Sequence, residues 1–132
     1  MHRLLAGAGA ALSLALAGCD GGAPNENVTR IAVANPHHDQ LAALSPPSQR
    51  LGLMRAIRDS GKRCQRVESG SYQQDYRGMK MWVALCNDGR HWGIFIAPNA
   101  DIQVRDCAEM DRLELPQCRP VAPPQAQVPA GS

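Results

Sequence analysis

The sequence of 132 residues predicts an α+β domain in which an N-terminal helix packs on three or four antiparallel strands and two disulfides tie the chain. Three observations predict this fold. Residues 46–60 carry an apolar stripe at helical spacing, two apolar runs within 79–97 flank an Asp-Gly pair, and four cysteines follow residue 60. The domain is expected to cover residues 46–118, because Pro- and Gly-rich segments precede and follow it.

The chain begins with a short apolar segment. His2 and Arg3 precede a run from Leu4 to Ala17 that contains only apolar residues, Gly and Ser. A bilayer-spanning helix needs roughly 20 apolar residues, whereas this run has about fourteen, which is typical of a signal-peptide core. We therefore expect residues 1–18 to form a signal peptide.

The run ends in Leu16-Ala17-Gly18-Cys19, which resembles the lipobox of bacterial lipoproteins. The resemblance covers only the first nineteen residues. It implies cleavage before Cys19, acylation of the Cys19 thiol and acylation of the new amino group. An ordinary signal peptidase would instead favour a small-x-small site such as Ala15-Leu16-Ala17. Asp20 resembles the inner-membrane retention signal of enterobacterial lipoproteins, so we expect a lipid anchor facing the periplasm, at the inner rather than the outer membrane.

Both flanks of the domain are rich in turn-forming residues. Residues 19–45 are predicted to be a flexible tether, and about 26 such residues would reach roughly 28 Å. Residues 119–132 contain four prolines and are predicted to be a Pro-rich disordered tail.

The helix over 46–60 has clear ends. Ser45 suits the N-cap and Pro46 the first helical position, while Gly61 suits the position just after the end. Leu51, Leu53, Met54 and Ile57 form its apolar stripe. Gly52 within it would permit close approach to a sheet.

Two strands are expected, an alternating one at 79–86 and a largely apolar run at 91–97, and Asp88-Gly89 between them favours a hairpin. A third short strand is expected at Ile102–Arg105 and a weaker one near 63–68. Asp106-x-x-Glu109 resembles a capping box that opens a short helix ending before Pro116.

The expected hairpin register places Val83 opposite Ile94. Residues 81, 83 and 85 would then face the helix with 92, 94 and 96. The other face would hold Trp82 opposite Phe95. This second face is either covered by the C-terminal helix or left exposed as a partner-binding patch formed by Trp82 and Phe95.

Four cysteines remain once Cys19 carries lipid, and export favours their pairing. Their spacings of 22, 21 and 11 lack the close pairs of a zinc site. A hairpin centred near residue 75 would place Cys64 opposite Cys86, which leaves Cys107 with Cys118. A Cys86–Cys107 bridge is the alternative.

Two short segments contain metal-type ligands. His37-His38-Asp39 lies in the expected tether, where no fold preorganises it. Met79-Lys80-Met81-Trp82 resembles the Met-x-Met plus Trp element of periplasmic copper-binding proteins, although the two Met also suit a core face. We predict no bound metal or cofactor, with a copper module as an alternative function.

Catalytic motifs are weak. His91 lies near Asp88 and Asp106 in the expected fold, but no serine stands in a supporting motif; the candidates would be Ser60, Ser69 and Ser71. We therefore predict that the chain is not an enzyme, and keep a small envelope enzyme as a second alternative.

Charge is unevenly distributed. Without Arg3 the chain has 13 basic and 12 acidic residues, so nothing indicates binding to nucleic acid. Six cations nevertheless cluster around a single acid, Asp59; they are Arg50, Arg55, Arg58, Lys62, Arg63 and Arg66. Residues 101–114 hold five acids and two arginines. The cations form a solvated face or attract anionic headgroups or an acidic partner.

The arrangement of the cysteines around the Asp-Gly turn also loosely resembles small secreted proteobacterial proteins, which implies no activity. The expected function is that of a membrane-anchored envelope lipoprotein, a non-enzymatic structural or protein-interaction module.

Overall fold

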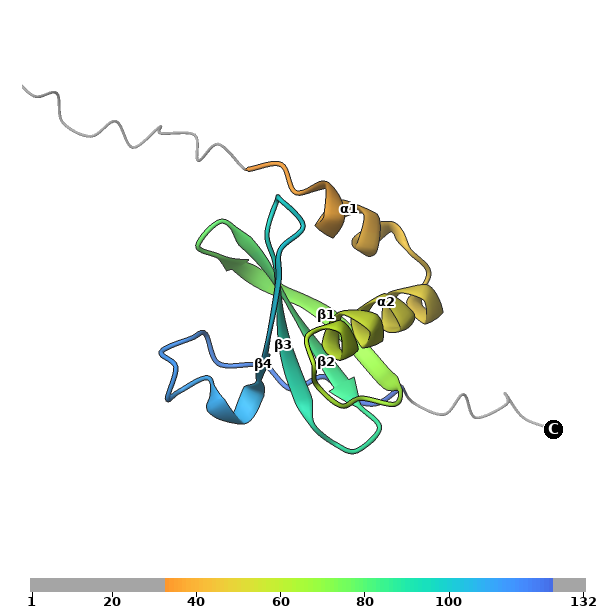
Figure 1. The fold of residues 1–132 in the computed structure, drawn as a ribbon. Helices are drawn as coiled ribbons and strands as arrows, with labels where there is room; N and C mark the ends of the chain where they lie inside the picture. The colour runs from red at the N-terminus through yellow and green to blue at the C-terminus, as the bar shows by residue number, and fades with distance from the viewer. Residues whose placement is uncertain (1–32, 125–132) are drawn as a thin grey trace, which may run out of the picture. The chain divides into compact units, whose positions relative to one another are not determined.

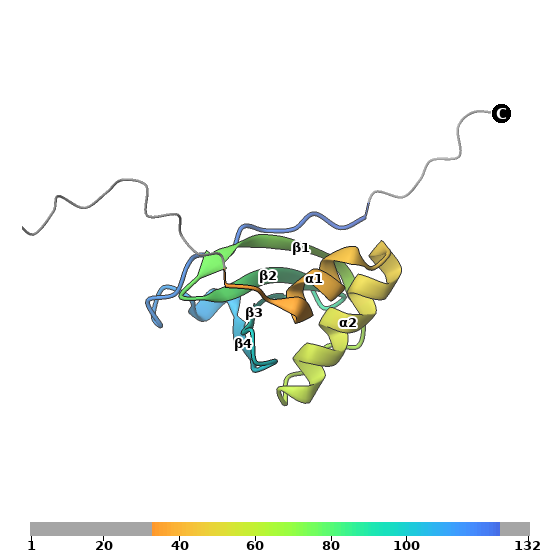
Figure 2. The same ribbon diagram turned by 90° about the horizontal axis from the view of Figure 1, so that it is seen from above.

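Four antiparallel strands form the centre of the structure, a computed structural model that describes residues 33–124. Helices α1 (Pro36–Ala43) and α2 (Pro46–Asp59) lie on one face of this sheet (Figure 1). The segment that follows the last strand crosses the other face (Figure 2). The predicted α+β fold with two disulfides is confirmed. The expectations for residues 1–32 and 125–132 lie outside the described residues.

Helix α1 occupies part of the segment predicted to be a tether, and that prediction is wrong for residues 35–45. The Asn35 side chain accepts a hydrogen bond from the His38 amide at 3.0 Å, and Pro36 follows it at the first helical position. Asn35 is also buried, and its Nδ2 donates to the Ile96 carbonyl at 2.8 Å. A cap and a docked amide therefore hold α1, whereas the hydrophobic periodicity used for prediction is weak there.

Helix α2 confirms the prediction for residues 46–60. It begins after Ser45, and Gly61 has a φ of +75° just beyond its end. Leu53 and Ile57 are buried against the sheet. A Cβ added to Gly52 would lie 3.1 Å from Leu41 Cδ1, so this glycine permits close approach of α1 rather than of the sheet.

The sheet is a simple meander in the order β1-β2-β3-β4. Its strands are β1 (Val67–Tyr76), β2 (Met79–Cys86), β3 (His91–Ile96) and β4 (Ile102–Asp106). The strands predicted at 79–86, 91–97 and 102–105 are confirmed. The weaker strand predicted near 63–68 actually spans 67–76, because the β1–β2 turn is formed by Arg77 and Gly78, both with positive φ.

The register of β2 with β3 differs from the prediction by one residue. Val83 pairs with Gly93 instead of Ile94, and Trp82 pairs with Ile94. The loop causes this shift: the Cys86 amide donates to the Arg90 carbonyl, and Gly89 has a φ of +87°. One extra residue in the loop turns the even-numbered side chains of β2 toward α2.

Apolar clusters cover both faces of the sheet. The cluster beneath the helices includes Leu53, Ile57, Trp82, Trp92 and Ile94. The opposite cluster consists of Met81, Val83, Phe95 and Met110, with further side chains from the C-terminal segment packed against it. The predicted core face of 81, 83 and 85 is therefore wrong, since residues 81 and 83 face away from α2.

The C-terminal segment is ordered further than predicted. Asp106 accepts from the Ala108 amide and caps a short 3-10 helix, η1 (Cys107–Glu109). The helix predicted to end before Pro116 is therefore much shorter, and Glu109 pairs with Arg112 instead of closing a capping box. The prediction of a disordered tail is wrong for residues 119–124. The Ser69 hydroxyl donates to the Ala122 carbonyl at 2.7 Å, and the Arg119 guanidinium donates to the Gln73 carbonyl at 2.7 Å. These side-chain contacts hold the segment beside β1.

Candidate functional site

Trp82 and Phe95 do not form the predicted contact patch. The observed register places them on opposite faces of the sheet, and they are only 3% and 1% exposed. Helices cover the face of Trp82, while Met110 and Tyr76 cover Phe95. The hypothesis that these two aromatic residues bind a partner is therefore wrong.

The four cysteines of the domain form the predicted disulfides, Cys64–Cys86 and Cys107–Cys118, with Cα–Cα distances of 5.8 and 5.6 Å. The geometric argument for the first pair was wrong, since Val67 pairs with Cys86 in the ladder and Cys64 precedes β1. None of the four is a free thiol, so none can act as a nucleophile or a thiolate ligand.

The metal-type residues are spread apart. Met81 is fully buried and packs with Phe95 and Met110, which favours a packing role. His37 and Asp39 are exposed on α1, while His38 turns toward the sheet. Within residues 33–124 no three His, Cys, Asp or Glu side chains are grouped to hold a metal ion.

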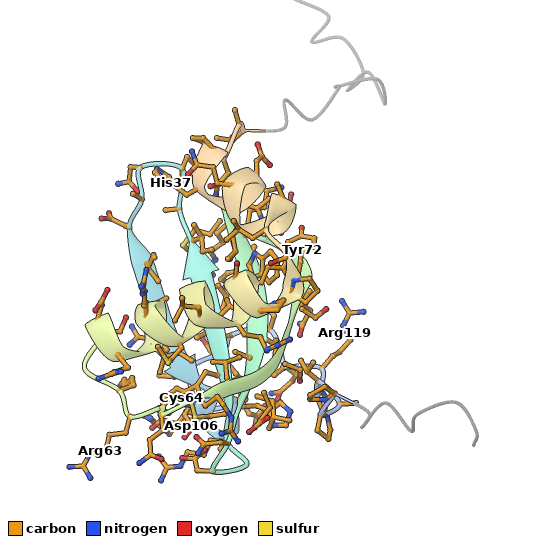
Figure 3. All side chains as sticks on the ribbon, turned by 90° about the vertical axis from the view of Figure 1, so that its right-hand side faces the viewer. His37, Arg63, Cys64, Tyr72, Asp106 and Arg119 are labelled. Carbon is orange, nitrogen blue, oxygen red and sulfur yellow. A yellow bond between two sulfur atoms is a disulfide. The ribbon has the colours of Figure 1, made fainter. Side chains whose placement is uncertain are left out.

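A polar and aromatic cluster joins α1 to the β1–β2 hairpin; we name it the α1–hairpin cluster, and it consists of His38, Tyr72, Asp75, Lys80 and Trp82. The Trp82 indole N–H donates to His38 Nδ1 at 3.0 Å. The His38 ring also lies 4.8 Å from the Tyr72 ring, centroid to centroid. Figure 3 shows Tyr72 at the edge of the sheet beside the helices. The cluster thus attaches α1 to the sheet.

The outer part of this cluster is charged. The Tyr72 hydroxyl donates to Asp75, and Lys80 Nζ donates to both Asp75 oxygens at 2.7 and 2.9 Å. Partial burial, then the hydrogen bond and charge of Asp75, raise the pKa of Tyr72 to about 12. The hydrogen bonds from Lys80 and Tyr72 lower the pKa of Asp75. At neutral pH Tyr72 is therefore a neutral donor and Asp75 an ionised acceptor.

Sequence reasoning missed the α1–hairpin cluster because it treated residues 35–45 as a tether. One signal could have found it. Asn35-Pro36 is a good N-cap followed by a proline at the first helical position. With a helix placed there, His38 and Leu41 fall on one face at a spacing of three.

The predicted cationic cluster lies along α2 and the turn that follows it. We name as the basic face of α2 the residues Arg50, Arg55, Arg58, Lys62 and Arg63. None of them forms an ion pair within the described residues, whereas Arg66 pairs with Glu68. A surface hollow of about 560 Å³ at the end of α2 is lined by Arg58, Lys62 and Arg63, together with Gly61, Cys64 and Gln65. Figure 3 shows Arg63 extending away from the domain. This surface can attract an anion.

Comparison with known proteins adds no functional assignment. No family model, curated protein or solved structure matches the chain. Neither α1 nor α2, the helices of the described region, is long and apolar enough to cross a membrane.

Proposed function

We propose that the protein is an envelope lipoprotein, anchored through Cys19 and facing the periplasm, whose domain acts through surface contacts rather than catalysis. The observation that carries this proposal is the apolar run from Leu4 to Ala17, which ends in Leu16-Ala17-Gly18-Cys19. Two or more acyl chains hold a protein stably on a membrane, since each buried CH₂ contributes about 0.8 kcal/mol. Asp20 favours the inner membrane.

The disulfides support an exported location. Cys64–Cys86 and Cys107–Cys118 together use all the cysteines after Cys19. Disulfides form and persist in oxidising compartments and are rare in reducing ones. A domain this small also gains stability from such cross-links.

Hydrogen bonds made by the candidate catalytic groups favour a non-enzymatic role. Ser60, Ser69 and Ser71 each donate to a backbone carbonyl, and none of these hydroxyls hydrogen-bonds to a histidine of the described residues. His91 Nε2 lies 3.2 Å from both the amide nitrogen and the carbonyl oxygen of Val121, so this ring holds the C-terminal segment. Neither arrangement provides an activated nucleophile.

Cell fractionation of the wild type and a Cys19→Ser variant tests this proposal. We expect the wild type in the membrane fraction, released by detergent but not by high salt. Cys19→Ser should lose the lipid and accumulate as an uncleaved precursor. Arg105→Gln is the matched control, since it leaves both the lipobox and the basic face of α2 intact. Release of the wild-type protein by salt alone would contradict the proposal.

A further inference from the structure

The exposed side of α2 carries a cationic stripe. Leu51, Arg55 and Arg58 are exposed, and their spacings of four and three place them along one side of the helix, while Lys62 is exposed just beyond its end. Leu53 and Ile57 point the opposite way, into the core. The stripe is therefore fixed in orientation by the packing of α2, and is not a set of independent surface charges.

Five cations lie on or just after α2 against one acidic residue, Asp59, which is exposed four positions after Arg55. Asp59 is the only acidic residue within α2, and Arg50, Arg55, Arg58, Lys62 and Arg63 lack an ion-pair partner among the described residues. The hollow at the end of α2 has three cationic residues and no acidic residue in its lining. An unpaired group of cations around a hollow favours a phosphate-bearing ligand.

Acidic residues gather on the opposite side of the sheet. Met110 and Leu115 pack on the face away from α2, and the segment that carries them holds Glu109, Asp111 and Glu114. The five cations on or just after α2 are thus unpaired within the described part of the chain, whereas the C-terminal segment sets Arg112 and Arg119 against its three acids, and Arg112 pairs with Glu109. Such a distribution orients a molecule at a charged surface.

We infer that the basic face of α2 docks the domain on anionic lipid headgroups of the membrane that carries its anchor; this inference rests on the proposed lipid anchor. Asn35 lies sixteen positions after Cys19, and even a fully extended chain over those sixteen steps spans at most roughly 58 Å. The membrane is therefore the anionic surface with the highest local concentration. Leu51, which is 45% exposed beside the cations, can enter the headgroup region.

Vesicle co-sedimentation tests the basic face without any contribution from the acyl chains of the anchor. The protein used is the mature chain, residues 19–132, with the substitution Cys19→Ser. The vesicles contain phosphatidylcholine alone, or phosphatidylcholine with a third replaced by phosphatidylglycerol. The test variant is Arg55→Gln/Arg58→Gln/Lys62→Gln. The control, Arg77→Gln/Arg105→Gln/Arg112→Gln, changes the net charge equally but lies outside α2. Near-ultraviolet circular dichroism checks that both variants are folded.

We expect binding to the anionic vesicles only, a loss of binding as salt rises, and a partition coefficient about tenfold lower for the test variant than for the control. No binding to anionic vesicles, or equal weakening by both variants, would overturn the inference. Binding to poly-glutamate but not to vesicles would overturn it too, in favour of an acidic protein partner. Since this chain cannot be acylated, a negative result here leaves the proposed anchor standing, and failure of the anchor appears only in cell fractionation.

Discussion

At the scale of single residues, the two tryptophans are buried almost equally but differ in hydrogen bonding. Trp82 and Trp92 are 3% and 4% exposed. The Trp82 indole N–H donates to His38, while Trp92 Nε1 is buried and has no partner among residues 33–124. A net hydrogen bond contributes about 1 kcal/mol, whereas an unsatisfied buried donor costs about 1–3 kcal/mol.

This difference predicts unequal effects of the same substitution. Trp82→Phe removes an indole N–H that is hydrogen-bonded and leaves His38 Nδ1 without that hydrogen bond. Trp92→Phe removes a buried indole N–H that has no partner among the described residues. Both delete the same atoms. We expect Trp82→Phe to lower the free energy of unfolding by about 1 kcal/mol more than Trp92→Phe. Urea denaturation measures both, and equal losses would contradict the described role of His38.

Tyr72 should ionise at a higher pH than an ordinary tyrosine. Its pKa of about 12 exceeds the ordinary value of 10.0, so its neutral form is favoured in the folded chain. The stability it contributes is present below pH 10.0 and is lost as the pH rises toward about 12. In a Tyr76→Phe background, phenolate absorbance reports Tyr72 alone. Adding Asp75→Asn should lower this pKa, because the Asp75 hydrogen bond and charge help to raise it. An unchanged titration would disprove the contact.

At the scale of elements, helices and strands with strong local sequence patterns were predicted more accurately than those with weak ones. α2 has a cap, an apolar stripe and a stop at Gly61, and it was predicted closely. α1 contributes mainly Leu41 to the apolar core and is held by polar contacts of Asn35 and His38, so hydrophobic periodicity could not find it. β1 is a mostly polar edge strand and was placed several residues too early.

The prediction of the β2–β3 register was wrong for a related reason. Both faces of β2 are buried, so its side chains are apolar on each side and neither set marks the core face. The loop with Gly89 then decided the pairing, and its extra residue cannot be deduced from an Asp-Gly pair alone.

The contact between α2 and β1 gives a prediction at this scale. A Cβ on Gly70 would collide with Leu53 Cδ1, and Leu53 is almost fully buried. We expect Gly70→Val to lower the free energy of unfolding by about 1–3 kcal/mol through overpacking. Ser71→Val, at an exposed position of the same strand, is the control and should change little. Thermal unfolding compares them, and similar midpoints would contradict the packing of α2 on β1.

At the scale of the whole molecule, the sites differed in how far the sequence could specify them. The presence of disulfides followed from the even number of cysteines after Cys19 and from the export that the lipobox resemblance implies. The pairing was correct although the strand register assumed for Cys64 was wrong. The cationic cluster followed from composition, since one helix carries most of it. The Trp82–Phe95 patch depended on the β2–β3 register, and it was lost when the register moved by one residue. The α1–hairpin cluster needs a long-range contact between residues 38 and 82, which no local pattern contains.

The central claim is that Cys19 carries the lipid that holds this domain at the membrane. Metabolic labelling with palmitate, followed by immunoprecipitation, tests it most directly. Label should enter the wild-type chain and the Arg105→Gln control, and Cys19→Ser should contain none. Label on the Cys19→Ser chain, or none on the wild type, would contradict the claim.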